Sequence, residues 1–158
     1  MKRQAILATL LSLSLSAVCA ADLPAHHAHA PAHDGRALLE LNPDERAMIL
    51  EEMRLFLDGV QKISGALAKP DMVAVADSAR GLGQKMAPEV PPALHAKLPL
   101  EFRQLGFSVH HDFDQIALDA DSLKDVSHSL NQLSDTLQKC VSCHATYQIR
   151  TSIHGGNH

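Results

Sequence analysis

Two cysteines and a histidine close to the C-terminus have types and spacing that can carry chemistry: Cys140, Cys143 and His144 form a C-x-x-C-H pattern. Two thiols at this spacing can each form a thioether with one vinyl group of haem, and the adjacent imidazole can bind the iron as its proximal ligand. A zinc site needs about four ligands, and the sequence has no second cysteine pair. A redox-active dithiol is expected in a βαβ context, which the sequence does not show. The pattern therefore predicts one covalently attached haem c.

The first 20 residues have the features of a secretory signal peptide. Lys2 and Arg3 precede a mostly apolar run from Ala5 to Leu15, and small residues lead to an expected cleavage site after Ala20 or one residue later. The run is too short for a comfortable membrane span. We therefore expect export to a bacterial periplasm.

Export also bears on the cysteines. Cleavage would remove Cys19 and leave Cys140 and Cys143 as the only thiols, both available for haem. A lipoprotein with an acylated Cys19 is the less favoured alternative, because Val18 is bulky for the position before a lipidated cysteine. The expected organisation is a signal peptide (1–20), a flexible leader rich in His, Ala and Pro (21–40), a cytochrome c domain (41–153) and a short tail (154–158).

The charge balance restricts the partners. Loss of Lys2 and Arg3 from the 14 basic residues leaves 12 against 18 acidic residues, a net charge of about −6 with His neutral. This acidity, without a basic stripe, argues against binding nucleic acid and favours a basic redox partner protein. No other segment approaches membrane-spanning length, so no membrane span is expected after signal cleavage.

The leader contains a group of histidines in a segment without apolar periodicity. Such a segment could bind a transition metal such as Cu, Ni or Zn. A solvated tail is the favoured reading, and a metal-handling protein stays open as a second alternative function. The histidines concerned are His26, His27, His29 and His33.

Apolar residues at steps of three and four predict four helices. The first begins at Pro43, after the N-cap Asn42, and ends near residue 68. The others are expected at about 70–86, 97–121 and 122–151. In the last of them the apolar stripe continues directly into Cys140 and His144. Because nothing in the sequence predicts a strand, the expected fold is all-α, an antiparallel four-helix bundle with covalently bound haem.

With the motif in the last of four helices, the chain resembles the cytochrome c′ family, the class II c-type cytochromes. The likeness covers roughly residues 40–152 and includes Tyr147, three residues after the ligand His144, and a methionine in the first helix. The segments ISGALAKPD and CVSCHATY are the closest matches. The family often has an arginine directly after the aromatic residue, where this chain has Gln148.

The resemblance implies one of two states for the distal side of the iron. Some members leave it open and bind NO or CO, whereas the six-coordinate branch supplies a methionine from the first helix. The resemblance also implies a homodimer formed through the first two helices.

Met53 is the expected distal ligand because it should lie at the same height along the bundle as His144. If the last helix ends near Thr151, His144 lies about 10 Å from that end, at about 1.5 Å per residue. The same level on the antiparallel first helix falls at residues 51–53. Met48 is about 7.5 Å nearer the bundle end and points about 140° away. Core packing is the alternative role for Met53.

The remaining candidates are assigned by position. His110 and His111 are rival distal ligands, and both are disfavoured, since His110 already lies about 7.5 Å too far along the third helix. We expect them instead at the surface or behind the residues that contact the haem. Four apolar residues should line the haem pocket: Phe56, Leu57, Leu105 and Val109. Three cations could meet the haem propionates: Arg54, Arg103 and Arg150.

The sequence therefore predicts a periplasmic monohaem c-type cytochrome that carries single electrons. It shows no paired carboxylates and no nucleophile–base pair, so no enzyme activity is expected. The first alternative is a five-coordinate haem protein that binds NO or CO.

Overall fold

The computed structural model describes residues 34–87 and 90–151. The expected signal peptide, residues 21–33 of the leader and the expected C-terminal tail lie outside these residues. The described part is mostly helical, as the all-α prediction requires, with five helices and one small two-stranded sheet.

The first helix, α1 (Pro43–Leu67), begins where the sequence predicts. Asn42 Oδ1 accepts from the backbone N–H of Glu45 at 2.9 Å, and the Glu45 carboxylate accepts from the backbone N–H of Asn42 at 2.9 Å. This capping box satisfies two donors that a helix start leaves free. Lys97 donates to the same carboxylate at 2.7 Å, and this bond, followed by the bond from Asn42, lowers the pKa of Glu45.

Two predicted helices differ from the structure in their ends, and one short helix was not predicted. The second, α2 (Met72–Arg80), ends six residues earlier than expected, since the glycines at 81 and 83 weaken a helix. A short helix, α3 (Pro92–Lys97), precedes α4 (Leu100–Ser122), which corresponds to the third predicted helix. The last helix, α5 (Val126–Thr146), stops five residues before the expected end at Thr151.

The prediction that no strand is present was wrong. Strands β1 (Ala37–Leu41) and β2 (Tyr147–Thr151) pair in parallel, with Leu39 opposite Ile149 and Glu40 opposite Arg150. The leader expected at residues 21–40 therefore overlaps a strand. An isolated two-stranded sheet is marginal, and this one is supported by packing on α1 and α3.

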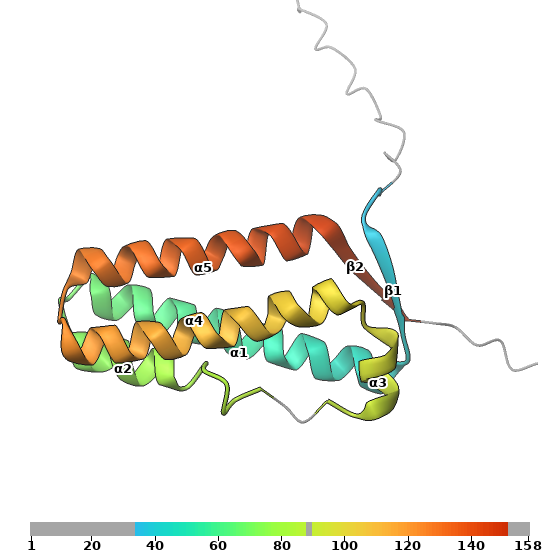
Figure 1. Cartoon of the computed structure of the whole chain (residues 1–158), viewed down its shortest axis with the longest axis horizontal. Helices are drawn as coiled ribbons and strands as arrows, with labels where there is room; N and C mark the ends of the chain where they lie inside the picture. Colours follow the sequence, from blue (N-terminus) through green and yellow to red (C-terminus); the bar gives the residue numbers. More distant parts are fainter. Residues whose placement is uncertain (1–33, 88–89, 152–158) are drawn as a thin grey trace, which may run out of the picture. The chain divides into compact units, whose positions relative to one another are not determined.

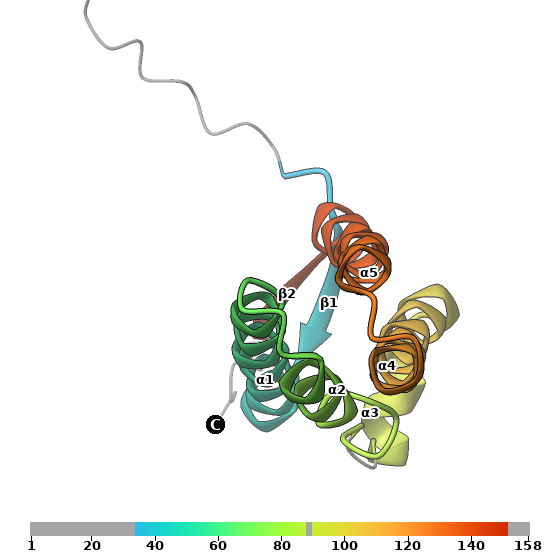
Figure 2. The same ribbon diagram turned by 90° about the vertical axis from the view of Figure 1, so that its left-hand side faces the viewer.

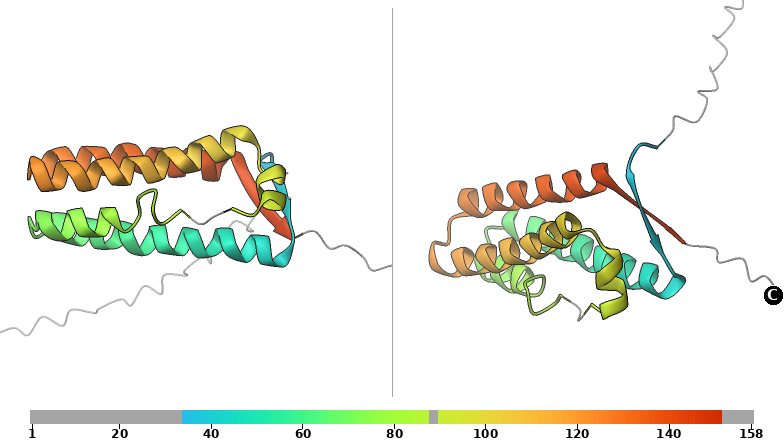
Figure 3. Two further views of the ribbon diagram at one scale, coloured as in Figure 1. Left: turned by 60° about the horizontal axis from the view of Figure 1, so that its bottom comes forward. Right: turned by 45° about the vertical axis from the view of Figure 1, so that its right-hand side comes forward.

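Four of the described helices pack in the order α1, α2, α4 and α5. Helix α2 packs against both α1 and α4, and α5 packs against α4, whereas the backbones of α1 and α5 stay apart along most of their length. Figure 1 shows β1 and β2 at the end of the helices where α5 stops, and the end-on view in Figure 2 shows α2 between α1 and α4. In Figure 3, α1 extends past the end of α5, and β2 fills the difference.

The buried apolar residues form two separate clusters. The helical cluster lies where α1, α2, α4 and α5 approach one another, and the strand cluster joins β1 to α1 and α3. Fully buried members of the helical cluster include Ile63, Val75, Phe113 and Ile116. The strand cluster consists of Leu39, Leu41, Ile49, Leu94 and Leu98.

The sequence also predicted that no segment after the signal peptide spans a membrane. Within residues 34–87 and 90–151, no helix combines the length and apolar character needed to cross a bilayer.

Two glycines of α1 should respond oppositely to alanine. A Cβ at Gly59 would overlap the side chain of Leu82, with Cγ at 2.7 Å, and Leu82 is too buried to move away. At Gly65 the nearest atom is 3.8 Å away. We expect Gly59→Ala to lower the free energy of unfolding by about 1–3 kcal/mol through overpacking. Gly65→Ala should raise it by up to about 1 kcal/mol, because alanine favours the helix. Urea unfolding followed by circular dichroism measures both, and equal effects would contradict the close approach of Leu82.

Candidate functional site

The C-x-x-C-H motif occupies the last two turns of α5. Asp125 starts this helix by accepting from the backbone N–H of His128 at 3.0 Å. Residues three and four apart share a helix face, so Cys140, Cys143 and His144 all lie on the wall of one cavity. Both thiols are free and half-buried, whereas His144 is exposed.

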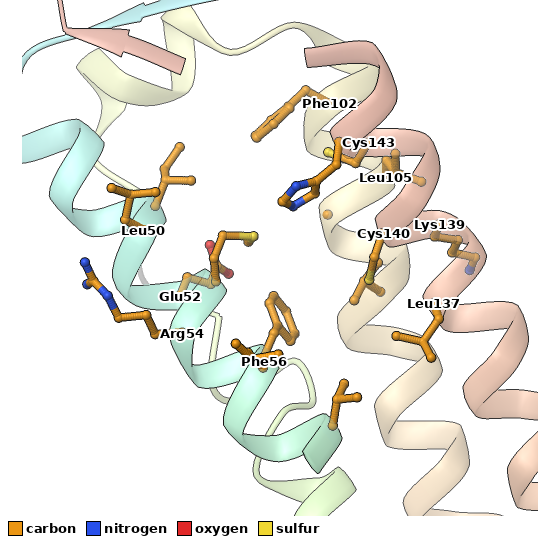
Figure 4. Close-up of a pocket in the computed structure, with 17 residues that line it drawn as sticks. Leu50, Glu52, Arg54, Phe56, Phe102, Leu105, Leu137, Lys139, Cys140 and Cys143 are labelled. Atoms are coloured by element: carbon orange, nitrogen blue, oxygen red, sulfur yellow. The ribbon is translucent and has the colours of Figure 1, made fainter. Parts of the chain in front are cut away.

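The cavity has a volume of about 470 Å³ and lies between α1, α4 and α5. Figure 4 shows Cys140 and Cys143 on the α5 side, facing Glu52 and Phe56 on α1. Its surface is almost entirely apolar, and its size falls in the range of organic ligand sites. The four residues expected to line a haem pocket all line this cavity: Phe56, Leu57, Leu105 and Val109.

The cavity separates the two apolar clusters. Phe56 and Val60 on its wall pack against the helical cluster, and Met53 and Phe102 pack against the strand cluster. Helix α5 packs mainly against α4, so its apolar stripe is only partly covered, and Leu137 is 38% exposed on the cavity wall. The core is therefore interrupted at the level of the motif.

Met53 and His144 line the same cavity, although one premise of the prediction that they lie at one level was wrong. Helix α5 ends at Thr146 and not near Thr151. The error is offset because α1 starts beyond the end of α5, with β2 between them (Figure 3). Met48 packs with the strand cluster and does not line the cavity.

His110 is buried behind the cavity wall, one of the two places expected for it, and contacts Glu52 there. Its Nδ1 lies 2.8 Å from the Leu82 carbonyl oxygen, and its Nε2 lies 2.9 Å from Glu52 Oε1. Burial lowers the pKa of His110, but the hydrogen bond to Glu52 and then the bond to Leu82 outweigh burial, so the pKa is raised. Because both ring nitrogens are hydrogen-bonded, neither is free to act as a ligand of the iron. His111 is exposed and does not line the cavity.

A second, more polar cavity of about 390 Å³ adjoins the first and shares His144 and Met53 with it. Three arginines line it: Arg36 just before β1, Arg46 on α1 and Arg150 on β2. Of the three cations expected from the sequence, Arg150 is thus beside the site. Arg54 lines the apolar cavity but pairs with Glu51 at 2.9 Å, and Arg103 contacts His95 and lines neither cavity.

Sequence reasoning missed Arg36 and Arg46, because only the pairing of β1 with β2 brings Arg36 to α5. The Arg36 guanidinium donates to the carbonyl oxygens of His144 at 3.2 Å and Tyr147 at 3.4 Å. Gln148, which stands where the resemblance expects an arginine, donates from its side chain to the Arg36 carbonyl at 3.0 Å. These bonds brace the end of α5 that carries the motif.

The part of the chain that the structure describes contains no group of three or more His, Cys, Asp or Glu side chains arranged to hold a metal ion. The histidines of the leader, at positions 26, 27, 29 and 33, lie outside the described residues. The metal-handling alternative therefore stays a prediction.

The two thiols should react slowly in the folded chain. Burial raises the pKa of both, and the Asp112 carboxylate adds to the rise at Cys140. Less thiolate is then present at pH 8 than in an unfolded chain, whose thiols titrate near about 8.5. We expect iodoacetamide to alkylate the folded protein with free thiols more slowly than the urea-unfolded protein between pH 7 and 9, as measured by mass spectrometry. Because the folded state holds these protons more tightly, stability should fall as the pH rises above about 8.5. For the alkylation experiment, equal rates in the folded and unfolded proteins would show that the thiols are not shielded.

Comparison with known proteins adds no assignment: no family model, no curated protein and no solved structure matches this chain.

Proposed function

We propose that this protein is a monohaem c-type cytochrome that carries single electrons. Haem is attached through Cys140 and Cys143, His144 is the proximal ligand, and Met53 is the distal ligand. In this proposal the protein is a carrier and not an enzyme. It belongs with the proteins that the sequence resembles, the six-coordinate branch of the cytochrome c′ family.

The proposal rests on the side chains that line two facing walls of one cavity, those of α5 and α1. Two thiols and an imidazole lie on α5, a thioether lies on α1, and the surface between them is apolar. These are the groups that attach and ligate haem c. The residues present therefore fit the group that the motif implies.

Bound haem would supply a one-electron couple at the iron. The chain's own residues set the conditions for it. Phe56, Leu105 and Val109 exclude water and lower the local dielectric, and a methionine ligand raises the reduction potential. Arg46 and Arg150 line the adjoining cavity, so they offer cations to the haem carboxylates.

The position of Met53 favours electron transfer over the alternative, a five-coordinate haem that binds NO or CO. That alternative needs a distal wall that supplies no ligand, whereas Met53 lines the same cavity as His144 from the facing helix.

The finer structural features are part of the same proposal. Helices α1, α2, α4 and α5 act as the four-helix bundle around the haem, and α3 and the sheet are additions to it. The protein works in the periplasm after signal cleavage, exchanges electrons with a partner protein there, and pairs with a second copy through its first two helices.

Covalent attachment is tested by exporting the protein in a host that matures c-type cytochromes. We expect a coloured product whose mass exceeds that of the cleaved chain by one haem. A Cys140→Ser and Cys143→Ser double variant should lack both the colour and the mass gain. A colourless wild-type product with the mass of the polypeptide alone would exclude the proposal.

The distal ligand is tested by comparing two methionines of α1. The reduced wild-type protein should show a low-spin spectrum that CO does not change. Met53→Leu should give a high-spin spectrum that shifts with CO and a lower reduction potential, because the iron loses its thioether ligand. Met48→Leu is the matched control and should behave as the wild type. An unchanged spectrum in Met53→Leu would remove this residue from the coordination sphere.

A further inference from the structure

His110 connects three elements beside the cavity. It lies on α4, is 4% exposed, and bonds to the Leu82 carbonyl after α2 and to the Glu52 carboxylate on α1. A carbonyl oxygen only accepts, so Nδ1 must donate to Leu82. Nε2 then donates to an ionised Glu52 or accepts from a protonated one, so the bond exists in either form.

The bond to Glu52 joins α1 to α4 at a place where the two backbones stay apart and the contacts are made by side chains. Within the described helices, the backbones of α1 and α4 stay apart, although both pack on α2. Among the described residues, no other hydrogen bond or ion pair joins α1 to α4. Phe56 adds aromatic contacts, with its ring 4.9 Å from that of His110 and 5.7 Å from that of Phe113. Figure 4 shows Glu52 and Phe56 together on the α1 wall of the cavity.

Stability alone does not account for this pair. Burying a polar pair costs desolvation, and well-packed apolar replacements are often equally stable or more stable. A hydrogen bond differs from an apolar contact in having direction. The bond from His110 can therefore fix the rotation of α1 about its own axis.

That rotation matters for the next residue. Met53 follows Glu52 and is turned about 100° from it around the helix. With the backbones of α1 and α5 apart, direct packing between those two helices does not set the direction of Met53. We propose that His110 is a positioning residue that, through Glu52, orients α1 so that Met53 faces His144 across the cavity. This inference rests on the proposed function.

The test compares two variants of Glu52 in the haem-loaded protein. Glu52→Leu removes the bond, whereas Glu52→Gln keeps it, since an amide N–H donates to Nε2 of a neutral His110. We expect Glu52→Leu to raise the apparent CO affinity of the reduced protein about tenfold or more, because a loosened Met53 competes less well. Glu52→Gln should restore the wild-type value. Haem content, measured by mass, should be the same in all three proteins.

A second readout does not depend on haem. Amide hydrogen exchange of residues 49–56 should be about tenfold faster in Glu52→Leu than in Glu52→Gln, whether or not haem is attached. The double variant Glu52→Leu with His110→Leu removes both partners of the bond and leaves the Leu82 carbonyl without its side-chain donor. It should show the same fast exchange. The control removes a more exposed pair elsewhere, His128 and Asp119, which lie 3.0 Å apart between α5 and α4. Their replacement by leucine should leave both readouts unchanged.

The outcomes separate the two claims. A wild-type protein without haem overturns the proposed function, and the exchange measurement then still decides whether the bond holds α1. Normal haem content with CO affinity and exchange unchanged in Glu52→Leu overturns the role of His110 alone. Equal loss of melting temperature in all variants, with no specific change near residues 49–56, would show a merely structural bond.

Discussion

The hydrophobic core of this protein is divided by the cavity between α1, α4 and α5, and the rest of the structure depends on that division. Protein interiors are usually close-packed, yet Leu57 is 72% exposed and Leu137 38% exposed on the cavity wall. Burial of apolar surface contributes about 25 cal/mol per Å². An apolar group placed here would therefore gain stability by joining the helical cluster to the strand cluster. The motif on α5 stands where that group would be held.

The cavity walls are fixed from both ends. At one end α2 packs between α1 and α4, and at the other the strand pair ties the end of α5 to the start of α1. Arg36 and Gln148 add side-chain bonds to that second tie. Between these two ends, the bond from His110 to Glu52 joins α4 to α1 beside the cavity. The helices that form the walls are thus held apart without direct packing that would fill the space.

Local signals explain which parts could be predicted from the sequence. The start of α1 depends on Asn42 and Glu45, three residues apart, and the cavity side of α5 follows from one apolar stripe. The strands depend instead on pairing between Ala37–Leu41 and Tyr147–Thr151, about a hundred residues apart. Each strand has only five residues, and the second follows a helix whose pattern gives no clear stop. The burial of His110 likewise depends on partners 28 and 58 residues away.

Met53 and His144 line one cavity although the fold was predicted incompletely. The prediction of a shared level assumed that α1 and α5 end together, which would be true of helices joined only by short loops. Here β2 continues the chain after Thr146 and lies against α1, so it fills the length that the helix was expected to occupy. Because β2 runs obliquely from the end of α5 to the start of α1 (Figure 1), α1 still begins beyond the end of α5, as a longer α5 would have required. The level of Met53 therefore depends on the distance along the helix axes between His144 and the start of α1, and an oblique strand supplies that distance as a continued helix would.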